Sequence, residues 1–535
     1  MGQPKDGVTL SLARGDRVGF EQLPPRQSAN TAVMQPDPAS VAGKQPPIGE
    51  SSDLLIIGAG PAGMAAALAA AGRGVRVTLV DENPIPLRTM GEEVPLHFGA
   101  RMAATLANHN AVLDRILAAN PQLAEAMDAG VDVRVGTVAW GLFPQHRTAA
   151  WLGGFVVGLA EEGRAYLMRV GQVIVAAGRR DMGLAFDGWH LPGVMGATAA
   201  HRLATLYNAL ESKVAVLVGS DAEALQVGNA LADAGVRIAA IVEQAAAVIG
   251  PEHLLSRLKS HGTRVFTNNV IQRAHGDQQG VTSVELASAT ISCDTVLLAV
   301  GAIPAIELFE SSGCAVSFQP DRGGHVPEVD RWQRTSLPLV LAAGDCAGIW
   351  PTKSLSEAIA RSEGRIAAAA ALRVLGVDSA EEPAVQPDVP MSDISERRLA
   401  WVRAAVLESP AQPFVCQCEE VTAREILGLR PPRYLGWQAA IHPETGCSPD
   451  VVKRLTRAGM GPCQGRRCRE QIAALVALDS NTALATVPLA SYRTPVRPLS
   501  LRQLAQLPEA PAMNDHWDSW FGMPSQWVPF WRIAK

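Results

Sequence analysis

Residues 53–81, DLLIIGAGPAGMAAALAAAGRGVRVTLVD, contain the pattern that decides the fold. The apolar run at 54–57 predicts a buried parallel strand, and the Ala-rich run at 64–71 predicts a helix. A second apolar run at 75–80 predicts another strand. Because a strand, a helix and a strand follow one another with short turns, the stretch is typical of a Rossmann-like unit.

Three glycines occupy the turn before the helix, because Gly58, Gly60 and Gly63 have G-x-G-x-x-G spacing. Such glycines permit a tight turn, close approach of the backbone to a pyrophosphate, and close packing of helix on strand. The helix N-terminus adds free N–H groups and the positive end of a dipole. Asp81 ends the second strand, where a carboxylate would hold a ribose hydroxyl. The combination predicts a bound dinucleotide; the alternative is a Rossmann-like unit that has lost its ligand.

The composition excludes several classes of protein. The chain has 535 residues, of which 47% are hydrophobic and 19% charged, and its formal net charge is −5. This length predicts about two to four domains. The charge offers no basic field for nucleic acid, and no run of about 18 apolar residues predicts a membrane span. Because the N-terminus lacks the apolar core of a secretory signal, we expect a cytoplasmic protein.

Residues 213–243 repeat the strand–helix–strand plan with a weaker glycine pattern. Gly219 is followed by Ser220 and Asp221, which puts a carboxylate where a pyrophosphate would approach. Glu243 could still hold a ribose. The repeat is interpreted as a nicotinamide-nucleotide site, as a site for another nucleotide such as an adenine nucleotide, or as a structural domain.

Two further apolar runs end in glycine. VIVAAG ends at Gly178, and LVLAAGD ends in Gly344 and Asp345 before a helix predicted at 355–375. Asp345 is placed to accept a hydrogen bond from a cofactor hydroxyl; the alternative is a turn or helix-capping role. The sequence also predicts a helix at 103–127, and small antiparallel strands at 131–135 and 165–169, before the separate VIVAAG strand.

Four of the eight cysteines form two close pairs near the C-terminal end. Cys416 and Cys418 make a C-x-C pair, and Cys463 and Cys468 make a C-x4-C pair. In a cytosolic chain such pairs favour a metal over disulfides. Four thiolates are the ligand set of a [2Fe–2S] cluster, and zinc is the rival interpretation. Three further cysteines are expected to be buried small apolar side chains: Cys293, Cys314 and Cys346.

GAGPAGMAAA, VIVAAG, VLLAVGAIP and LVLAAGD resemble recurring segments of two-dinucleotide-domain flavoprotein oxidoreductases. GWHLPGVMGATAA and the cysteine pairs make the chain similar to the larger, FAD-binding (A or alpha) subunits of bacterial heteromeric amine dehydrogenases. These include opine oxidases, hydroxyproline dehydrogenase and hydrogen cyanide synthase. The resemblance covers residues 51–505. It implies an α/β fold with Rossmann-like FAD and NAD(P)-like domains. It also implies a small α-rich [2Fe–2S] domain like that of bacterioferritin-associated ferredoxin.

The resemblance also implies which residues bind cofactors. The cluster would be held by Cys416, Cys418, Cys463 and Cys468. FMN at a subunit interface is a further cofactor that it suggests. FAD would be contacted by Gly58, Gly60, Pro61, Ala62, Gly63, Asp81, Glu82, Gly178, Gly344 and Asp345.

The sequence departs from its relatives at three places. The segment NPIPLRTMGEE at 83–93 lacks the Gly-Gly-Gln that many relatives carry beside the flavin. The second unit has lost its glycines, which argues against a nicotinamide substrate. No C-x-x-C or C-x4-C lies near the first unit, so a disulfide reductase is not expected.

We therefore expect an electron-transfer subunit, in which a flavin takes two electrons and an iron–sulfur cluster carries one at a time. The 11 histidines form no motif, so no catalytic residue is assigned. The resemblance implies that an amine, imino acid or amino-acid derivative is oxidised on a partner FAD subunit of the D-amino-acid-oxidase type. It also suggests a small [2Fe–2S] ferredoxin-like subunit. The alternatives are a stand-alone NAD(P)H-dependent ferredoxin-type reductase and a non-catalytic scaffold.

These interpretations divide the chain into successive segments. The last contains many aromatic residues, between Trp517 and Trp531, which we expect to pack on this chain or on a neighbour. The segments are an N-terminal arm (1–50), the first part of the FAD domain (51–206), an NAD(P)-like domain (207–324), the second part of the FAD domain (325–375), a linker and packing helix (376–412), the [2Fe–2S] domain (413–480) and a tail (481–535).

Overall fold

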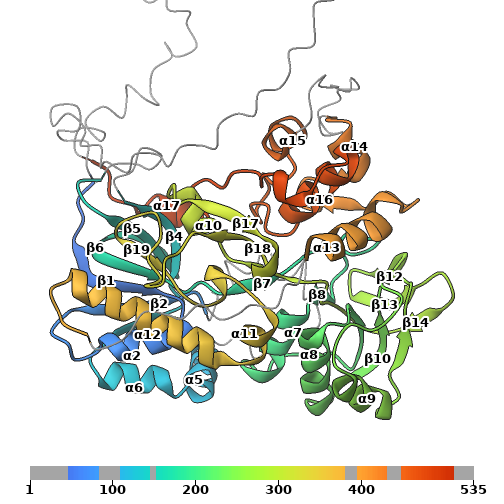
Figure 1. Cartoon of the computed structure of the whole chain (residues 1–535), viewed down its shortest axis with the longest axis horizontal. Coiled ribbons are helices and arrows are strands. Elements are labelled where there is room, and N and C mark those ends of the chain that lie inside the picture. The colour runs from blue at the N-terminus through green and yellow to red at the C-terminus, as the bar shows by residue number, and fades with distance from the viewer. Residues whose placement is uncertain (1–45, 84–108, 145–151, 380–393, 431–447, 511–535) are drawn as a thin grey trace, which may run out of the picture. The chain divides into compact units, whose positions relative to one another are not determined.

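The computed structural model describes residues 46–83, 109–144, 152–379, 394–430 and 448–510 (Figure 1). Most of the expected N-terminal arm, part of the expected linker and the aromatic part of the tail lie outside the described residues. Within the described residues, no helix has the length and apolar character needed to cross a membrane.

The first predicted strand–helix–strand unit forms inside a seven-stranded sheet. Its elements are β1 (Glu50–Ile57), α2 (Pro61–Ala70) and β2 (Val77–Asp81). β1 pairs in parallel with β2 and with β6 (Arg164–Val175), and β19 (Val340–Ala342) pairs in parallel with β6. The carboxyl ends of β1, β6 and β19 therefore meet at one edge, where ligands of open α/β sheets bind.

Smaller elements complete this part of the chain. The helix α12 (Glu357–Val374) lies beside α2 (Figure 1). Gly364 permits this approach, because a Cβ there would overlap the Ala62 carbonyl oxygen. The elements are β3 (Asp132–Val135), β4 (Val138–Phe143), β5 (Val156–Glu161), β7 (Arg179–Asp181), β16 (Ala302–Pro304), α10 (Glu307–Ser311), β17 (Val316–Gln319), β18 (Gly324–Pro327), α11 (Pro351–Leu355) and α12 (Glu357–Val374).

The helix predicted at 103–127 is two helices in its described part. α5 (His109–Ala119) ends before Asn120, and α6 (Gln122–Asp128) begins after Pro121. Proline has no N–H to continue the hydrogen-bond ladder of a helix, so the first helix ends before Pro121.

Two strand predictions were wrong in direction or extent. β3 pairs in parallel with β2 rather than antiparallel, because the α5 and α6 crossover returns the chain to the same edge of the sheet. The runs predicted as separate strands at 165–169 and 173–178 form the single strand β6 as far as Val175. β6 pairs antiparallel with β5 over Arg164–Arg169 and parallel with β1 over Met168–Val175, and the overlap of the two pairings holds it continuous.

The second unit has its own five-stranded parallel sheet, with order β11-β10-β9-β15-β8. A three-stranded antiparallel sheet, β12-β13-β14, lies beside it. The elements are β8 (Val194–Gly196), α7 (Ala197–Thr205), β9 (Val214–Val218), α8 (Ala222–Asp233), β10 (Arg237–Val242), α9 (Glu252–Ser260), β11 (Arg264–Phe266), β12 (Arg273–Asp277), β13 (Gly280–Glu285), β14 (Thr290–Ser292) and β15 (Thr295–Leu298).

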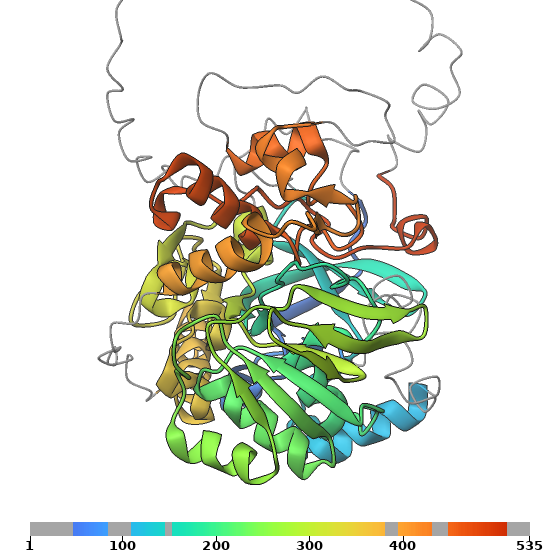
Figure 2. The same ribbon diagram turned by 90° about the vertical axis from the view of Figure 1, so that its right-hand side faces the viewer.

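The C-terminal segment is mainly helical and shares a core with the second unit. Trp401 and Ile472 belong to the same buried apolar cluster as Val216 of β9. Figure 2 shows its orange and red helices gathered on one side of the green and yellow strands. The elements are α13 (Ile394–Val402), a π-helical turn (Arg403–Leu407), β20 (Phe414–Cys416), β21 (Val421–Thr422), α14 (Ala423–Leu427), α15 (Pro449–Thr456), α16 (Arg469–Ser480) and α17 (Leu501–Leu504).

Candidate functional site

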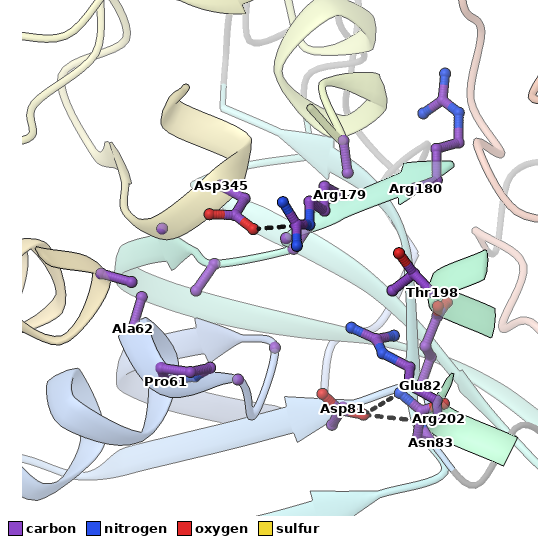
Figure 3. A pocket seen from close by; sticks show the side chains of 18 of the residues that line it. Pro61, Ala62, Asp81, Glu82, Asn83, Arg179, Arg180, Thr198, Arg202 and Asp345 are labelled. Carbon is purple, nitrogen blue, oxygen red and sulfur yellow. Dashed lines mark hydrogen bonds and ion pairs between the residues drawn. The ribbon is translucent and has the colours of Figure 1, made fainter. Parts of the chain in front are cut away.

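A cavity of about 640 Å³ opens where β1, β6 and β19 end (Figure 3). Its size is within the range of cofactor pockets. Of the residues predicted to contact FAD, Gly63 does not line it. Those that do are Gly58, Gly60, Pro61, Ala62, Asp81, Glu82, Gly178, Gly344 and Asp345.

The three glycines of the first turn have different roles in the structure. Gly58 has φ +109°, and a Cβ there would overlap the Ala176 carbonyl oxygen. A Cβ on Gly63 would overlap the Gly58 carbonyl oxygen, so Gly63 serves close packing behind the turn. A Cβ on Gly60 would have no atom within 4 Å, although Gly60 lines the cavity. The turn therefore leaves open space beside Gly60, as a pyrophosphate requires.

The N-terminus of α2 faces this space without a side-chain cap. Gly60 is its N-cap residue and has no side chain, and Pro61 follows at the first helical position. The next N–H groups, of Ala62 and Gly63, consequently receive no side-chain cap. The helix end can donate to an anionic ligand.

The Asp81 carboxylate is oriented by the glycine turn. Its Oδ2 accepts a hydrogen bond from the Ala59 N–H at 2.6 Å, and its Oδ1 accepts from the N–H and Nδ2 of Asn83 at 2.8 and 2.9 Å. Figure 3 shows Asp81 at the cavity wall beside Asn83. An ionised carboxylate has about four acceptor sites, so a ribose hydroxyl could still bind.

A buried ion pair holds the second turn that borders the cavity. The Lys353 side chain has no exposed surface, and its Nζ donates to the backbone oxygens of Gly344 and Gly348, both at 2.9 Å. The same Nζ lies 2.7 Å from Glu363 Oε2, which accepts a hydrogen bond from the Gly344 N–H at 2.8 Å. Each charge therefore has an oppositely charged partner. The pair holds the Gly344–Asp345 turn through both the N–H and the carbonyl oxygen of Gly344.

Arg179 joins the two Rossmann units across the cavity. Its Nε lies 3.2 Å from Asp345 Oδ2 (Figure 3), and its Nη1 donates to Ser354 Oγ at 2.9 Å. The same guanidinium pairs with Glu223 of α8, with an Nη1–Oε2 distance of 2.9 Å. Burial raises the pKa of Glu223 to about 7, although Arg179 acts in the opposite direction.

The four predicted cluster ligands come together as two pairs of thiols. A hydrogen bond with Cys468 lowers the pKa of the Cys416 thiol, and a hydrogen bond with Cys463 raises the pKa of the Cys418 thiol. Cys418 is exposed and the other three are buried. The backbone also contacts one of these sulfurs, because the Gly459 N–H donates to Cys416 Sγ at 3.4 Å. The prediction that Cys293, Cys314 and Cys346 are buried is confirmed.

Among the described residues, no three His, Cys, Asp or Glu side chains are placed to hold one metal ion. Gly461 stands beside the exposed thiol, where a Cβ would overlap the Cβ of Cys418. The geometry thus brings the four thiols together without itself identifying a ligand.

Arg180 connects the cavity to the loop between Cys463 and Cys468. Its Nε donates to the backbone oxygen of Arg466 at 3.2 Å, and its Nη2 lies 2.8 Å from Glu470 Oε1. It also pairs with Glu307. Arg180 and Arg466 both line the cavity, so the cysteine loop forms part of the cavity wall.

Sequence reasoning missed the charged residues that organise this site. Arg179 follows directly on VIVAAG, and this adjacency was the one local signal for it. Lys353 and Glu363 carry no motif, although they act on a turn only 5 to 19 positions away. Arg466 meets Arg180 across 286 positions, so no spacing rule relates them.

Comparison with known proteins shows two matching families. The family described as Pyridine nucleotide-disulphide oxidoreductase matches residues 52–370, and the Sarcosine oxidase A3 domain matches residues 447–507.

Curated relatives match most of the chain. The A subunit of opine oxidase from Agrobacterium tumefaciens (strain Ach5) is 31% identical over 85% of this chain and 92% of its own. The A subunit of opine oxidase from Rhizobium meliloti is 30% identical over 86% of this chain and 88% of its own. The HcnB subunit of hydrogen cyanide synthase from Pseudomonas aeruginosa is 27% identical over 77% of this chain and 90% of its own. Each name describes one subunit of a larger enzyme.

Among solved structures, L-proline dehydrogenase from P. horikoshii shares the fold. The TM-score is 0.56 with 20% identity, over 85% of this chain and 79% of that chain.

Proposed function

Because the chain belongs to the pyridine nucleotide-disulphide oxidoreductase family and is a flavin-dependent oxidoreductase, we propose that it is the electron-transfer subunit of a heteromeric dehydrogenase. Its cofactors in this proposal are FAD and a [2Fe–2S] cluster. The substrate is an amine, imino acid or amino-acid derivative, oxidised on a partner FAD subunit of the D-amino-acid-oxidase type. The names of the relatives, as subunits of opine oxidase and hydrogen cyanide synthase, support partner subunits.

FAD fits the residues that line the cavity. The open space beside Gly60 and the uncapped N-terminus of α2 suit its pyrophosphate. Asp81 suits the ribose of its adenosine part, and Asp345 suits a hydroxyl of its ribityl part. When bound, FAD supplies two-electron chemistry and can pass electrons on singly. The chain's own part is to hold FAD and to keep the turn at Gly344 fixed through Lys353 and Glu363.

A [2Fe–2S] cluster fits the chemistry of the four thiols. Cys416, Cys418, Cys463 and Cys468 would be its ligands, as four thiolates are for such clusters. The thiols associate in two pairs, and the loop that carries one pair borders the cavity that fits FAD. A flavin there would be an electron partner for a redox-active cluster, which favours iron and sulfide over zinc.

One observation carries the relay proposal: Arg466, which lies between Cys463 and Cys468, lines the same cavity as the glycine turn. A cofactor in that cavity would therefore be separated from the thiols by a single loop. The arrangement favours electron transfer within the chain over a non-catalytic scaffold. The sequence-based domain division, the FMN at a subunit interface and a small ferredoxin-like subunit remain parts of the proposal.

Cofactor analysis of the purified chain tests this function. We expect about one FAD and two irons per chain after reconstitution. Cys463→Ser should lose the iron and keep FAD, whereas the control Cys293→Ser should keep both, because Cys293 is buried in the second unit. A wild-type chain that binds neither flavin nor iron would support the scaffold alternative instead.

A further inference from the structure

The second Rossmann unit repeats the backbone of the first but not its open turn. Gly219 has φ +107°, and a Cβ there would overlap the Ala299 carbonyl oxygen, just as Gly58 approaches Ala176. The N-cap of the following helix is Gly60 in the first unit and Asp221 in the second. Asp221 Oδ1 accepts a hydrogen bond from the Ala224 N–H at 2.8 Å. A carboxylate of the chain thus occupies the helix end that a pyrophosphate would use.

Arg397 of α13 fills the space beyond this carboxylate. Its Nη1 lies 2.7 Å from Asp221 Oδ2, and its Nη2 lies 3.8 Å from Glu243 Oε2. Glu243 directly follows β10 and is fully buried. Its Oε2 accepts from Ser220 Oγ at 2.6 Å, and its Oε1 accepts from the Ala245 N–H at 3.1 Å. Glu243 has no exposed surface, whereas Asp81 lines the cavity, so the acid that could have held a ribose in the second unit is not accessible to one.

The loop before α9 closes the same turn from another direction. The Ile249 N–H donates to Ser220 Oγ at 3.2 Å, and the Gly250 N–H donates to the Ser220 carbonyl oxygen at 2.7 Å. A Cβ on Gly250 would lie 2.8 Å from that oxygen, so the two backbones are in contact. In the first unit, by contrast, the turn at Gly60 borders the 640 Å³ cavity.

The first turn of α8 is also tied to the flavin side. Glu223 pairs with Arg179, which itself pairs with Asp345. At this helix end, Asp221 is therefore paired with Arg397 and Glu223 with Arg179. An added pyrophosphate would meet the Asp221 carboxylate and would have to displace Arg397.

We infer that the second unit takes no pyridine nucleotide and instead holds α13 as an internal ligand through Arg397 and Asp221. The residues present do not fit the nucleotide that the family's description implies. NADH and NADPH are therefore not electron donors to this chain. The unit fixes the position of the C-terminal helices instead, since Trp401 of α13 is buried in the same apolar cluster as Val216 of β9. Arg398, the residue after Arg397, also holds α13 to the flavin side, because it donates to the backbone oxygens of Ala302 and Gly323 at 2.9 and 2.8 Å.

Anaerobic titration of the FAD-loaded chain tests the exclusion. With excess NADH or NADPH we expect no bleaching of the flavin absorbance and no saturable change in nucleotide fluorescence. Dithionite should bleach the same sample, which shows that its flavin can be reduced. Stoichiometric bleaching, or saturable binding of either nucleotide, would overturn the inference.

Hydrogen exchange tests the internal ligand without any cofactor readout. Asp221→Asn keeps a good helix cap but removes the charge that binds Arg397, and Arg397→Ala removes the other partner. Both should increase amide exchange severalfold in the first turn of α8 and in α13. The control Arg403→Ala changes an exposed side chain just after α13 and should leave the amide exchange of α8 and α13 unchanged. Wild-type exchange in both partner variants would contradict the role of the pair.

Discussion

Lys353, which lines the cavity, forms an ion pair with Glu363 behind it, with Nζ 2.7 Å from Oε2 and the lysine side chain fully buried. The pair holds the turn that carries Asp345 through both its N–H and its carbonyl groups. It belongs to α11 and α12, and α12 also packs against α2. One helix therefore sets the separation between the two turns that we propose to contact FAD.

Lys353→Met should weaken FAD binding and destabilise the chain. Removal of one partner of a buried ion pair typically costs about 3–5 kcal/mol, because the remaining charge is uncompensated. Urea unfolding and fluorescence titration with FAD measure the two effects. Lys259→Met is the matched control, since Lys259 is half exposed in α9, and it should change neither quantity. Wild-type FAD affinity in Lys353→Met would show that the pair does not position the turn.

Gly60→Val and Gly58→Val should have different effects. Gly60 has φ −72° and open space beside it, so Gly60→Val should fold and lose FAD because the side chain enters the cavity. Gly58→Val should lose the fold itself, since φ is +109° and a Cβ would overlap the Ala176 carbonyl. Thermal unfolding and FAD content separate the two outcomes. Full FAD occupancy in Gly60→Val would place the nucleotide elsewhere.

The stability contribution of Glu223 should depend on pH. Burial raises the pKa of this carboxyl from 4.5 to about 7, so folding favours its protonated form. The stabilisation from protonation is present below pH 4.5 and is lost as the pH rises to about 7. The difference in unfolding free energy between wild type and Glu223→Gln should therefore fall across this interval. Parallel curves for the two proteins would contradict the raised pKa.

Local patterns allowed much of the first unit to be predicted. The G-x-G-x-x-G turn lies between β1 and α2, and Asp81 ends β2, because apolar periodicity and glycine spacing are properties of neighbouring residues. The expected flavoprotein oxidoreductase family is confirmed by the matching family and relatives. The four cysteines also come together, although a cluster stays a prediction.

Contacts between distant segments could not be predicted in the same way. The direction of β3 depends on its pairing with β2, and no residue within β3 encodes that choice. Arg397 binds Asp221 across 176 positions of the chain, so no spacing rule relates them. The weak glycine pattern of the second unit did indicate a changed site, and Asp221 was the visible sign of it.

Electron paramagnetic resonance of the dithionite-reduced, FAD-loaded chain tests the central claim most directly. We expect the signal of one reduced [2Fe–2S] cluster per chain, with bleaching of the flavin in the same sample. Cys463→Ser should lose the cluster signal, while its flavin absorbance should still bleach. Cys293→Ser should behave as wild type in both measurements. A wild-type chain that contains FAD, has been reconstituted with iron and sulfide, and shows no such signal would contradict the account.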